Sequence, residues 1–294
     1  MALRLIIATS HPIQYQVPWF RALEACSEID LTVLFLSLPD PKTQGRGFGV
    51  AFEWDVPLLN GYYWHVARTL SVGSRRWLIS PRTELQALRP DAVLITGWQR
   101  VGLIQLSIAA RAMGIPRLLR VESNGLEKRS FVARLRHRLL ARDIGAYLAI
   151  GKANRRFYRE LGVAPDRIHS APYFVDNDYF QQAAASLEAE RDALREKWGI
   201  PEGAVCFAFV GKLVHKKRPL DVAEALRLLL KRWPEARVHL LVVGSGALEE
   251  ELRDFCNAHR LPVSFTGFLN QSGIPAAYLA ADCIVLPSDF RETW

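Results

Sequence analysis

The stretch "VCFAFVGKLVHKKRPLDVAEALRLLLKRW", Val205–Trp233, contains the pattern that decides the fold. Its first six residues, Val205–Val210, form a continuous apolar run, which is typical of a strand buried on both faces of a sheet. A glycine and a short basic loop follow, and a helix is predicted from Pro219 to Trp233. A buried strand that leads through a loop into a helix is the repeating unit of a parallel α/β sheet.

The same alternation runs through most of the chain. Further strands are predicted at Leu3–Thr9, Leu31–Leu36, Ala92–Thr96, Arg117–Val121, Ala146–Ile150, Val238–Val243, Val263–Phe265 and Cys283–Leu286. Further helices are predicted at Gly102–Met113, Phe131–Ala141 and Ala247–Ala258. This pattern predicts an α/β protein whose parallel sheets are covered by helices on both faces.

The length of the chain predicts more than one domain. Its 294 residues exceed what a single hydrophobic core usually spans, and the alternation pauses near residues 170–200. We therefore expect two doubly wound domains, residues 1–180 and 204–294, joined by a linker and helix over residues 181–203. Ligands bind beyond the carboxyl ends of strands in such sheets, so two facing domains predict a ligand cleft between them.

Composition narrows the class of protein. Lys and Arg number 38 against 30 Asp and Glu, a formal charge of +8, which favours anionic partners. The four cysteines are far apart and predict reduced, mostly buried side chains in a cytoplasmic protein. No run reaches the roughly 18 apolar residues of a membrane span. Nucleic-acid binding is not expected of the basic stretch Lys128–Arg142, because no aromatic residue beyond Phe131 is interleaved with its basic residues.

The basic loop after the Val205–Val210 strand is the strongest candidate site. Gly211 would let a ligand approach the backbone closely. Lys212 and Lys217 stand five residues apart, beside the predicted start of a helix. Two ammonium groups next to a helix N-terminus suit a diphosphate. The alternative is a solvated basic turn, because lysines are common on surfaces.

Two other motifs are weaker. Gly244-Ser245-Gly246 follows a predicted strand, but Glu249 occupies the third glycine position of a dinucleotide fingerprint, so NAD or FAD is not expected. Asp176-Asn177-Asp178 could hold a metal ion, but Asx residues also favour turns. Turn chemistry is the favoured interpretation, so no metal site is predicted.

The motifs of the second half resemble a known family in combination. "GKLVHKKRP", a strand into "GSG", "VSFTGFL" and "LAADCIVLPSDFRETW" look like the second domain of the retaining family-four glycosyltransferases of the GT-B fold. "SHPIQYQVPWFRAL", "FEWDVPLLNGY" and "APYFVDNDYF" resemble first-domain segments of the same family. The resemblance implies transfer of a sugar from a nucleotide-diphosphate sugar to a hydroxyl acceptor, with retention, in surface polysaccharide or glycolipid synthesis. It implies no cofactor beyond that co-substrate.

The resemblance also implies roles for individual residues. Lys212, Lys217 and Glu292 would be the catalytic set. Lysine stands at 212 where the family more often has arginine, which keeps the charge and loses bidentate geometry. The implied donor-binding residues are Gly211, Lys212, Lys217, Gly244, Gly267, Phe268 and Glu292, and the implied acceptor-side residues are His11, Gln14, Tyr15 and Glu122.

Several alternatives stay open. Glu122 follows a predicted strand where many relatives have histidine; it could contact the acceptor, act as a base, or cap the next helix. The chain could instead be a sugar-nucleotide epimerase or hydrolase, or a binding protein without turnover. Incubating the donor without an acceptor separates the enzyme classes.

Two segments have uncertain roles at this stage. Pro39–Leu70 is too long for an ordinary connection, which predicts a binding loop or an irregular hairpin. In Lys128–Arg142, the residues Phe131, Leu135 and Leu139 form one stripe and arginines form another. The apolar stripe would face the core of the protein, with a solvated basic face opposite. Alternatively, the helix would attach the protein to an anionic membrane or steer an anionic acceptor.

The distribution of motifs along the chain predicts an incomplete second domain. Fewer than a hundred residues follow the linker, with four predicted strands, whereas a doubly wound half usually has about five or six. We therefore expect a C-terminal truncation of about 60–100 residues by domain-size arithmetic. The family's second glutamate would fall at position 300, and a chain without it would be inactive.

Overall fold

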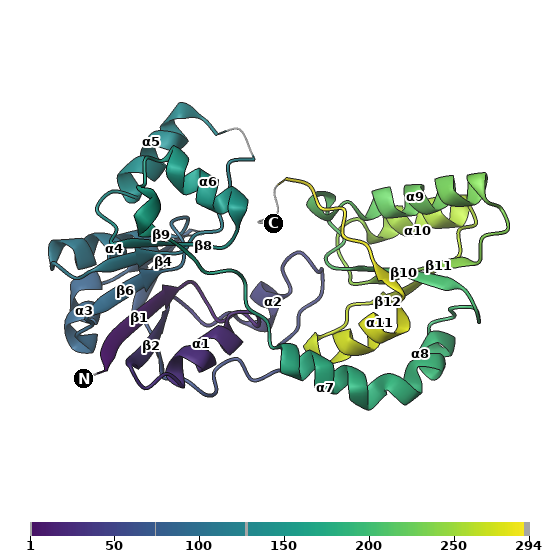
Figure 1. The fold of residues 1–294 in the computed structure, drawn as a ribbon, viewed down its shortest axis with the longest axis horizontal. Helices are drawn as coiled ribbons and strands as arrows, with labels where there is room; N and C mark the ends of the chain where they lie inside the picture. The colour runs from purple at the N-terminus through teal and green to yellow at the C-terminus, as the bar shows by residue number, and fades with distance from the viewer. Residues whose placement is uncertain (1, 74, 127–128, 291–294) are drawn as a thin grey trace. The chain divides into compact units, whose positions relative to one another are not determined.

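The computed structural model describes residues 2–73, 75–126 and 129–290, and the chain forms two compact units (Figure 1). Of the described residues, unit 1 contains those up to Leu38 together with those from Pro57 to Val175, and unit 2 contains Pro39–Val56 and those from Asp176 to Phe290. Each unit is a parallel α/β sheet with helices on both faces, so the prediction of two Rossmann-like α/β domains is confirmed. One difference from the predicted division is that Pro39–Val56 packs with unit 2.

The sheet of unit 1 has seven strands, all paired in parallel. In spatial order they are β3 (Trp64–Val66), β2 (Ile29–Phe35), β1 (Leu3–Thr9), β6 (Ala92–Ile95), β7 (Arg117–Leu119), β8 (Ala146–Ala149) and β9 (Ile168–Ser170). The chain order runs outward from β1 on one side and from β6 on the other. The carboxyl ends of β1 and β6 therefore mark the switch point at which such sheets bind ligands.

Five helices and a small hairpin complete unit 1. The helices are α1 (Val17–Glu24), α3 (Pro81–Leu88), α4 (Val101–Ala112), α5 (Phe131–Leu140) and α6 (Lys152–Glu160); the antiparallel strands are β4 (Thr69–Val72) and β5 (Arg75–Leu78). Successive residues of β1 point to opposite faces of the sheet. Ile7 packs with Phe20 of α1, and Ile6 lies in the cluster that contains Leu106 of α4 and Tyr158 of α6.

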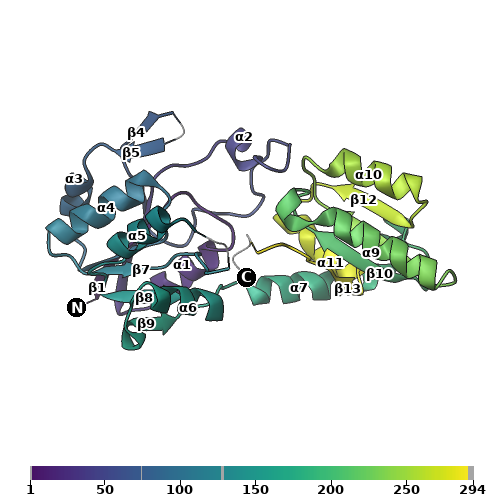
Figure 2. The same ribbon diagram turned by 90° about the horizontal axis from the view of Figure 1, so that it is seen from above.

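The sheet of unit 2 has four parallel strands, and Figure 2 shows its helices from a second direction. In spatial order the strands are β12 (Val263–Gly267), β11 (Val238–Val243), β10 (Val205–Val210) and β13 (Cys283–Ile284). The helices are α2 (Pro41–Gln44), α7 (Asn177–Leu187), α8 (Arg191–Lys197), α9 (Pro219–Arg232), α10 (Glu249–Ala258) and α11 (Ile274–Ala280). Helices α9 and α10 cover one face of the sheet, and α8 and α11 lie against the other.

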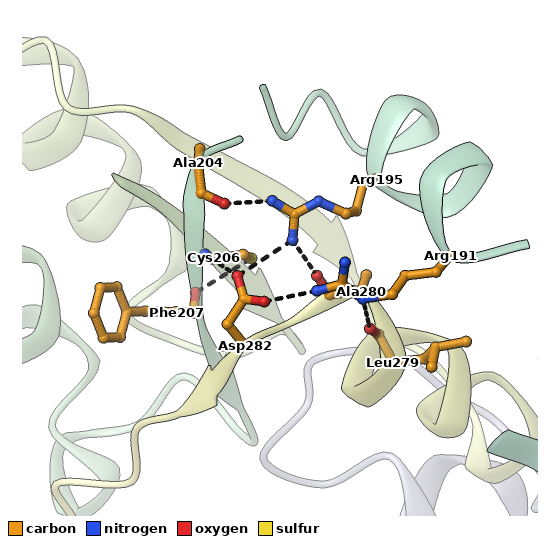
Figure 3. A network of polar contacts seen from close by, with 8 residues as sticks. All are labelled: Arg191, Arg195, Ala204, Cys206, Phe207, Leu279, Ala280 and Asp282. Carbon is orange, nitrogen blue, oxygen red and sulfur yellow. Dashed lines mark hydrogen bonds and ion pairs between the residues drawn. The ribbon is translucent and has the colours of Figure 1, made fainter. Parts of the chain in front are cut away.

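A polar network attaches α8 to the sheet of unit 2 (Figure 3). The guanidinium of Arg195, which is 7% exposed, donates to the carbonyls of Ala204 and Ala280 and forms an ion pair with Asp282. The second carboxylate oxygen of Asp282 binds Arg191 at 2.6 Å, and Asp282 also accepts the amide of Cys206 at 2.7 Å. The buried charge of Arg195 is therefore paired with a carboxylate and hydrogen-bonded to two carbonyls, as burial of a charge requires.

Helix α5 differs from the core-facing interpretation of its apolar stripe. Phe131, Leu135 and Leu139 are all exposed, and Phe131 retains 70% of its surface. The buried residue is His137, whose ring stacks on Trp98 at 4.6 Å. Among the described residues, no helix has the length and apolar content that crossing a bilayer requires.

Candidate functional site

The predicted donor-binding glycines lie at the carboxyl ends of three adjacent strands in unit 2. Gly211 follows β10, Gly244 follows β11, and Gly267 ends β12. The amide of Gly211 donates to Val243 at 2.9 Å, and the amide of Gly244 donates to Gly267 at 2.8 Å. The structure therefore brings these glycines together at the edge where α/β sheets bind ligands.

Lys212 and Lys217 lie on the loop between β10 and α9. Residues His215–Lys217 form a short 3₁₀ turn, and α9 begins at Pro219. Burial lowers the pKa of Lys212, and the charges of Lys216 and Lys217 lower it further. The loop thus gathers positive charge beside the N-terminus of a helix, and this arrangement favours an anion.

The segment Pro39–Val56, which we name the strap, covers part of this edge of unit 2. The Lys212 Nζ donates to the carbonyl of Arg46 at 2.9 Å and lies 4.5 Å from the ring centre of Phe48. The Ser245 hydroxyl donates to the carbonyl of Phe48 at 2.7 Å. A segment that lies in the sequence between two strands of unit 1 therefore contacts Lys212, one of the two predicted diphosphate residues, and Ser245.

The strap also contacts Phe268, one of the predicted donor-binding residues. Its ring lies 5.0 Å from Phe48 and 4.4 Å from Phe52, between ring centres. The Asn270 amide donates to the carbonyl of Glu53 at 2.6 Å, which fixes the far end of the strap. The sequence predicted a binding loop in this region but did not indicate which domain it contacts.

The predicted acceptor-side residues lie at the carboxyl edge of the unit 1 sheet. His11, Gln14 and Tyr15 follow β1, and Glu122 follows β7. Burial lowers the pKa of His11, and the charge of Arg100 lowers it further. The ring nitrogen Nδ1 of His11 lies 2.8 Å from the hydroxyl of Ser10.

Tyr173 connects two of these predicted residues, and sequence reasoning missed it. Its hydroxyl donates a short hydrogen bond to Glu122, and its ring meets Tyr15 edge-on at 5.4 Å. Burial raises the pKa of Tyr15 to about 12, with a further contribution from the charge of Glu122. Burial and the Glu122 hydrogen bond raise the pKa of Tyr173 as well. Both phenols therefore act as neutral hydrogen-bond donors near neutral pH.

The helix-cap alternative for Glu122 is not supported. Helix α5 begins at Phe131, and its cap is Ser130, whose hydroxyl accepts a hydrogen bond from the amide of Ala133 at 3.2 Å.

Asp176 has the turn role that the sequence favoured for it. Its carboxylate accepts a hydrogen bond from the amide of Tyr179 at the start of α7.

Glu292, the remaining predicted catalytic residue, lies outside the described residues. The roles of the site residues therefore stay predictions. Arg120, which follows β7, is a further functional candidate that sequence reasoning missed, because a single arginine after a strand carries no distinctive pattern.

Comparison with known proteins identifies both halves of the chain. The family described as "Glycosyl transferase 4-like domain" matches residues 16–173, and "Glycosyl transferases group 1" matches residues 190–294. A 2-deoxystreptamine glucosyltransferase of Streptomyces kanamyceticus is 29% identical over 238 residues, which cover 74% of this chain and 60% of that protein. An alpha-D-kanosaminyltransferase of the same organism is 26% identical, over 55% of this chain and 41% of that protein. The chain thus spans less than two thirds of the length of these relatives.

Solved structures show the same fold at low sequence identity. Anabaena HepE in complex with UDP superposes with a TM-score of 0.70 at 16% identity, covering 99% of this chain and 75% of that one. The UDP-GlcNAc 2-epimerase of Neisseria meningitidis has a TM-score of 0.58 at 13% identity, covering 97% and 76%. The family matches, taken with the two Rossmann-like sheets and the ligand edge of each, place the chain in the glycosyl transferase 4-like family, with a second half of the group 1 type.

Proposed function

We propose that this protein transfers a sugar from a nucleotide-diphosphate sugar to a hydroxyl acceptor with retention of anomeric configuration. The pair Lys212 and Lys217, held at the carboxyl end of β10 and beside the start of α9, carries the proposal. Membership of the family supports it, and the similar Anabaena structures contain UDP or UDP-glucose. The proposed setting is surface polysaccharide or glycolipid synthesis.

In the proposed reaction, the bond between the anomeric carbon and the phosphate oxygen breaks as the acceptor oxygen bonds to that carbon. The transition state has oxocarbenium character, as in glycoside hydrolysis. Negative charge grows on the leaving diphosphate, so Lys212 and Lys217 stabilise the transition state more than the ground state. Attack on the face from which the diphosphate departs retains the configuration, and the departing phosphate oxygen takes the acceptor proton.

The acceptor is proposed to bind to unit 1 at the carboxyl edge of its sheet. Glu122 and Tyr173 offer a carboxylate and a phenol that are already joined by a hydrogen bond. Tyr15 lies against Tyr173, and aromatic rings pack well against the apolar faces of sugars. Glu292 is proposed to accept hydrogen bonds from hydroxyls of the donor sugar.

A transfer assay tests the proposal. The protein is incubated with UDP-glucose or GDP-mannose and a panel of hydroxyl acceptors that includes glucose, glucuronate and 2-deoxystreptamine. We expect nucleoside diphosphate to form only when a suitable acceptor is present, and proton NMR of the product to show the anomeric configuration of the donor. An inverted product would refute retention.

The epimerase alternative has one observation in its favour, the structural likeness to a UDP-GlcNAc 2-epimerase. The same assay without acceptor decides between the transferase and the epimerase. A transferase leaves UDP-GlcNAc and UDP-glucose unchanged over the time in which it transfers sugar. Epimerised donor, or rapid donor hydrolysis without acceptor, would overturn the transferase proposal.

Helix α5 is proposed to attach the protein to an anionic membrane. Phe131, Val132, Leu135 and Leu139 expose 70%, 74%, 47% and 59% of their surface. The same helix contains Arg134, Arg136 and Arg138, all exposed. Apolar side chains that enter the acyl boundary beside arginines that contact anionic head groups are typical of interfacial helices.

Vesicle binding tests this attachment. We expect co-sedimentation with phosphatidylglycerol vesicles and little binding to phosphatidylcholine vesicles, with binding weakened by added salt. Replacing Phe131, Leu135 and Leu139 with serine is expected to weaken binding at least tenfold. Serine at Leu228, an equally exposed apolar residue of α9, is the matched control. Equal binding to both kinds of vesicle, or an unaffected triple variant, would contradict the proposal.

A further inference from the structure

Among the residues that the structure describes, three arginines are buried to nearly the same degree, and they differ in how their charges are satisfied. Arg117, Arg120 and Arg195 expose 6%, 6% and 7% of their surface. A buried guanidinium has five N–H donors and no acceptor, so it needs carbonyl, hydroxyl or carboxylate partners. The comparison among the three identifies which one retains donors for a ligand.

Two of the three arginines, Arg117 and Arg195, donate several hydrogen bonds within the protein. Arg195 has the carbonyl and carboxylate partners seen in Figure 3. Arg117 donates to the carbonyl and hydroxyl of Ser107, and to the carbonyls of Arg142 and Asp143, the last at 2.8 Å. Both guanidinium groups are held by at least three hydrogen bonds. They are structural arginines.

Arg120 is different. In the part of the chain that the structure describes, it donates one hydrogen bond, a long one of 3.4 Å from Nη2 to the carbonyl of Pro172. Its charge lies between two aromatic rings, 5.1 Å from Trp19 and 5.0 Å from Tyr173. Burial lowers the pKa of Arg120, and the nearby Tyr173 and Glu122 act in the opposite direction. The aromatic faces attract the charge but leave most of the N–H donors without acceptors.

These donors adjoin a cavity of about 30 Å³. It is lined by Tyr15, Gln16, Trp19, Arg120 and residues 171–174. On this measure one water needs 10–15 Å³, so the space holds about two water-sized groups, which is the size of a carboxylate. Pro172 and Phe174 of its lining are exposed, so the cavity lies close to the surface.

The cavity lies where a substrate of unit 1 would be expected. Tyr15 follows β1, Arg120 follows β7 and Tyr173 follows β9, so three carboxyl ends of one parallel sheet contribute to it. Tyr173 also joins the cavity to Glu122 of the proposed acceptor site. A group bound at Arg120 would therefore belong to the molecule that Glu122 contacts.

We propose that Arg120 binds an oxyanion of the acceptor, a carboxylate or a phosphate, in this cavity. The link to the acceptor rests on the proposed function; the anion site itself does not. The planar guanidinium can donate two parallel hydrogen bonds to such a group, and Trp19 and Tyr173 hold its plane in position. Glu122 contributes the negative charge nearby, and its hydrogen bond from Tyr173 directs that carboxylate toward the phenol. The acceptor would thus be an acidic sugar or a sugar phosphate.

Calorimetry with small probes tests the site without any transfer reaction. Glucuronate, glucose 6-phosphate and neutral glucose are titrated into the protein in a buffer free of oxyanions, at low salt. We expect binding of at least one anionic probe and none of glucose at the same concentrations. The anionic probe that binds more tightly indicates whether the site takes a carboxylate or a phosphate.

Variants separate a binding role from a packing role. Arg120→Gln is expected to weaken binding of the anionic probe at least tenfold. Arg120→Lys is expected to weaken binding less, because lysine keeps the positive charge but lacks the planar, bidentate geometry of the guanidinium. Arg82→Gln, an exposed arginine of α3, removes the same charge and should leave binding unchanged. Thermal unfolding of each variant shows whether it folds, and Arg120→Lys serves as the test if Arg120→Gln does not.

Three outcomes would overturn the proposal. Equal affinity for glucose and for the anionic probes would show that the site does not select for negative charge. Unchanged affinity for the anionic probe in a folded Arg120 variant would show that the anion binds elsewhere. If no probe binds to the wild-type protein, Arg120 serves packing alone. Because none of these measurements requires sugar transfer, a negative transfer assay would leave the anion site standing, and a negative titration would leave the transferase proposal standing.

Discussion

Replacing Lys212 and Lys217 together with alanine is expected to lower the rate of sugar transfer on the order of 10³-fold or more. Removal of one group that stabilises developing charge costs about 10²–10³-fold in well-studied enzymes. The two lysines are proposed to act on the same leaving diphosphate, so their effects will not simply multiply. The measurement is the initial rate of nucleoside diphosphate release with acceptor present.

The control for this pair is Lys216→Ala, on the same loop. Its charge contributes to the low pKa of Lys212, but it is not assigned to the diphosphate. We expect a rate within a few fold of the wild type. A Lys212→Arg variant should retain much of the activity, because arginine restores bidentate contact with phosphate. Full activity of the double alanine variant would refute the proposed mechanism.

The strap determines how these variants should be interpreted. The Lys212 ammonium donates to the carbonyl of Arg46, so alanine at 212 removes a contact that holds the strap as well as a charge. Phe48 and Phe52 hold the strap to Phe268 independently of that lysine. UDP binding should therefore be measured alongside turnover, since a loss of charge and a shift of the strap change affinity and rate differently.

The sequence was sufficient to predict the strands that lie inside each sheet. Val205–Val210 and Val238–Val243 agree with β10 and β11 residue for residue, because strands covered on both faces are uniformly apolar. The edge strands of the unit 1 sheet lack that pattern. Strand β3 at Trp64–Val66 and strand β9 at Ile168–Ser170 are short and mixed in character, and neither was predicted.

The site could be predicted only where each residue follows a recognisable strand. That rule located Gly211, Lys212 and Glu122, since a parallel sheet brings carboxyl ends to one edge. It could not locate Arg120 or Tyr173, because their importance depends on burial and on contacts from other segments. The exposure of the apolar stripe of α5 could not be predicted for the same reason. Periodicity predicts that a helix has an apolar face, but only the structure shows whether other segments cover that face.

The strap has long-range contacts that the sequence could not predict. Its residues lie in the sequence between β2 and β3 of unit 1, and its contacts are with unit 2. Local composition, rich in glycine and aromatic residues, predicted a binding loop there. No local pattern encodes the long-range partner, because the hydrogen bonds from Lys212 and Ser245 end on backbone carbonyls, which every residue provides.

Gly244→Ala is expected to destabilise unit 2 by about 2–4 kcal/mol, a large effect for one methyl group. Gly244 has a φ of +130°, which side-chain-bearing residues rarely adopt, and a Cβ there would overlap the carbonyl oxygen of Gly211. Both atoms of that overlap belong to the main chain or are fixed to it, so no side chain can rotate away. The strand-end loop that carries Lys212 must therefore move. The measurement is the midpoint of chemical unfolding, together with the affinity for UDP.

Gly162→Ala separates this overlap from the strain of a positive φ alone. Gly162 has a φ of +91°, and no atom lies within 4 Å of where its Cβ would be. Alanine there should cost about 1 kcal/mol and leave UDP affinity unchanged. Gly244→Ala should weaken UDP at least tenfold, because its Cβ displaces the backbone next to Lys212. If the two variants unfold at the same denaturant concentration and bind UDP equally, the close approach of Gly244 to Gly211 does not shape the donor site. The glycine would then serve turn geometry alone.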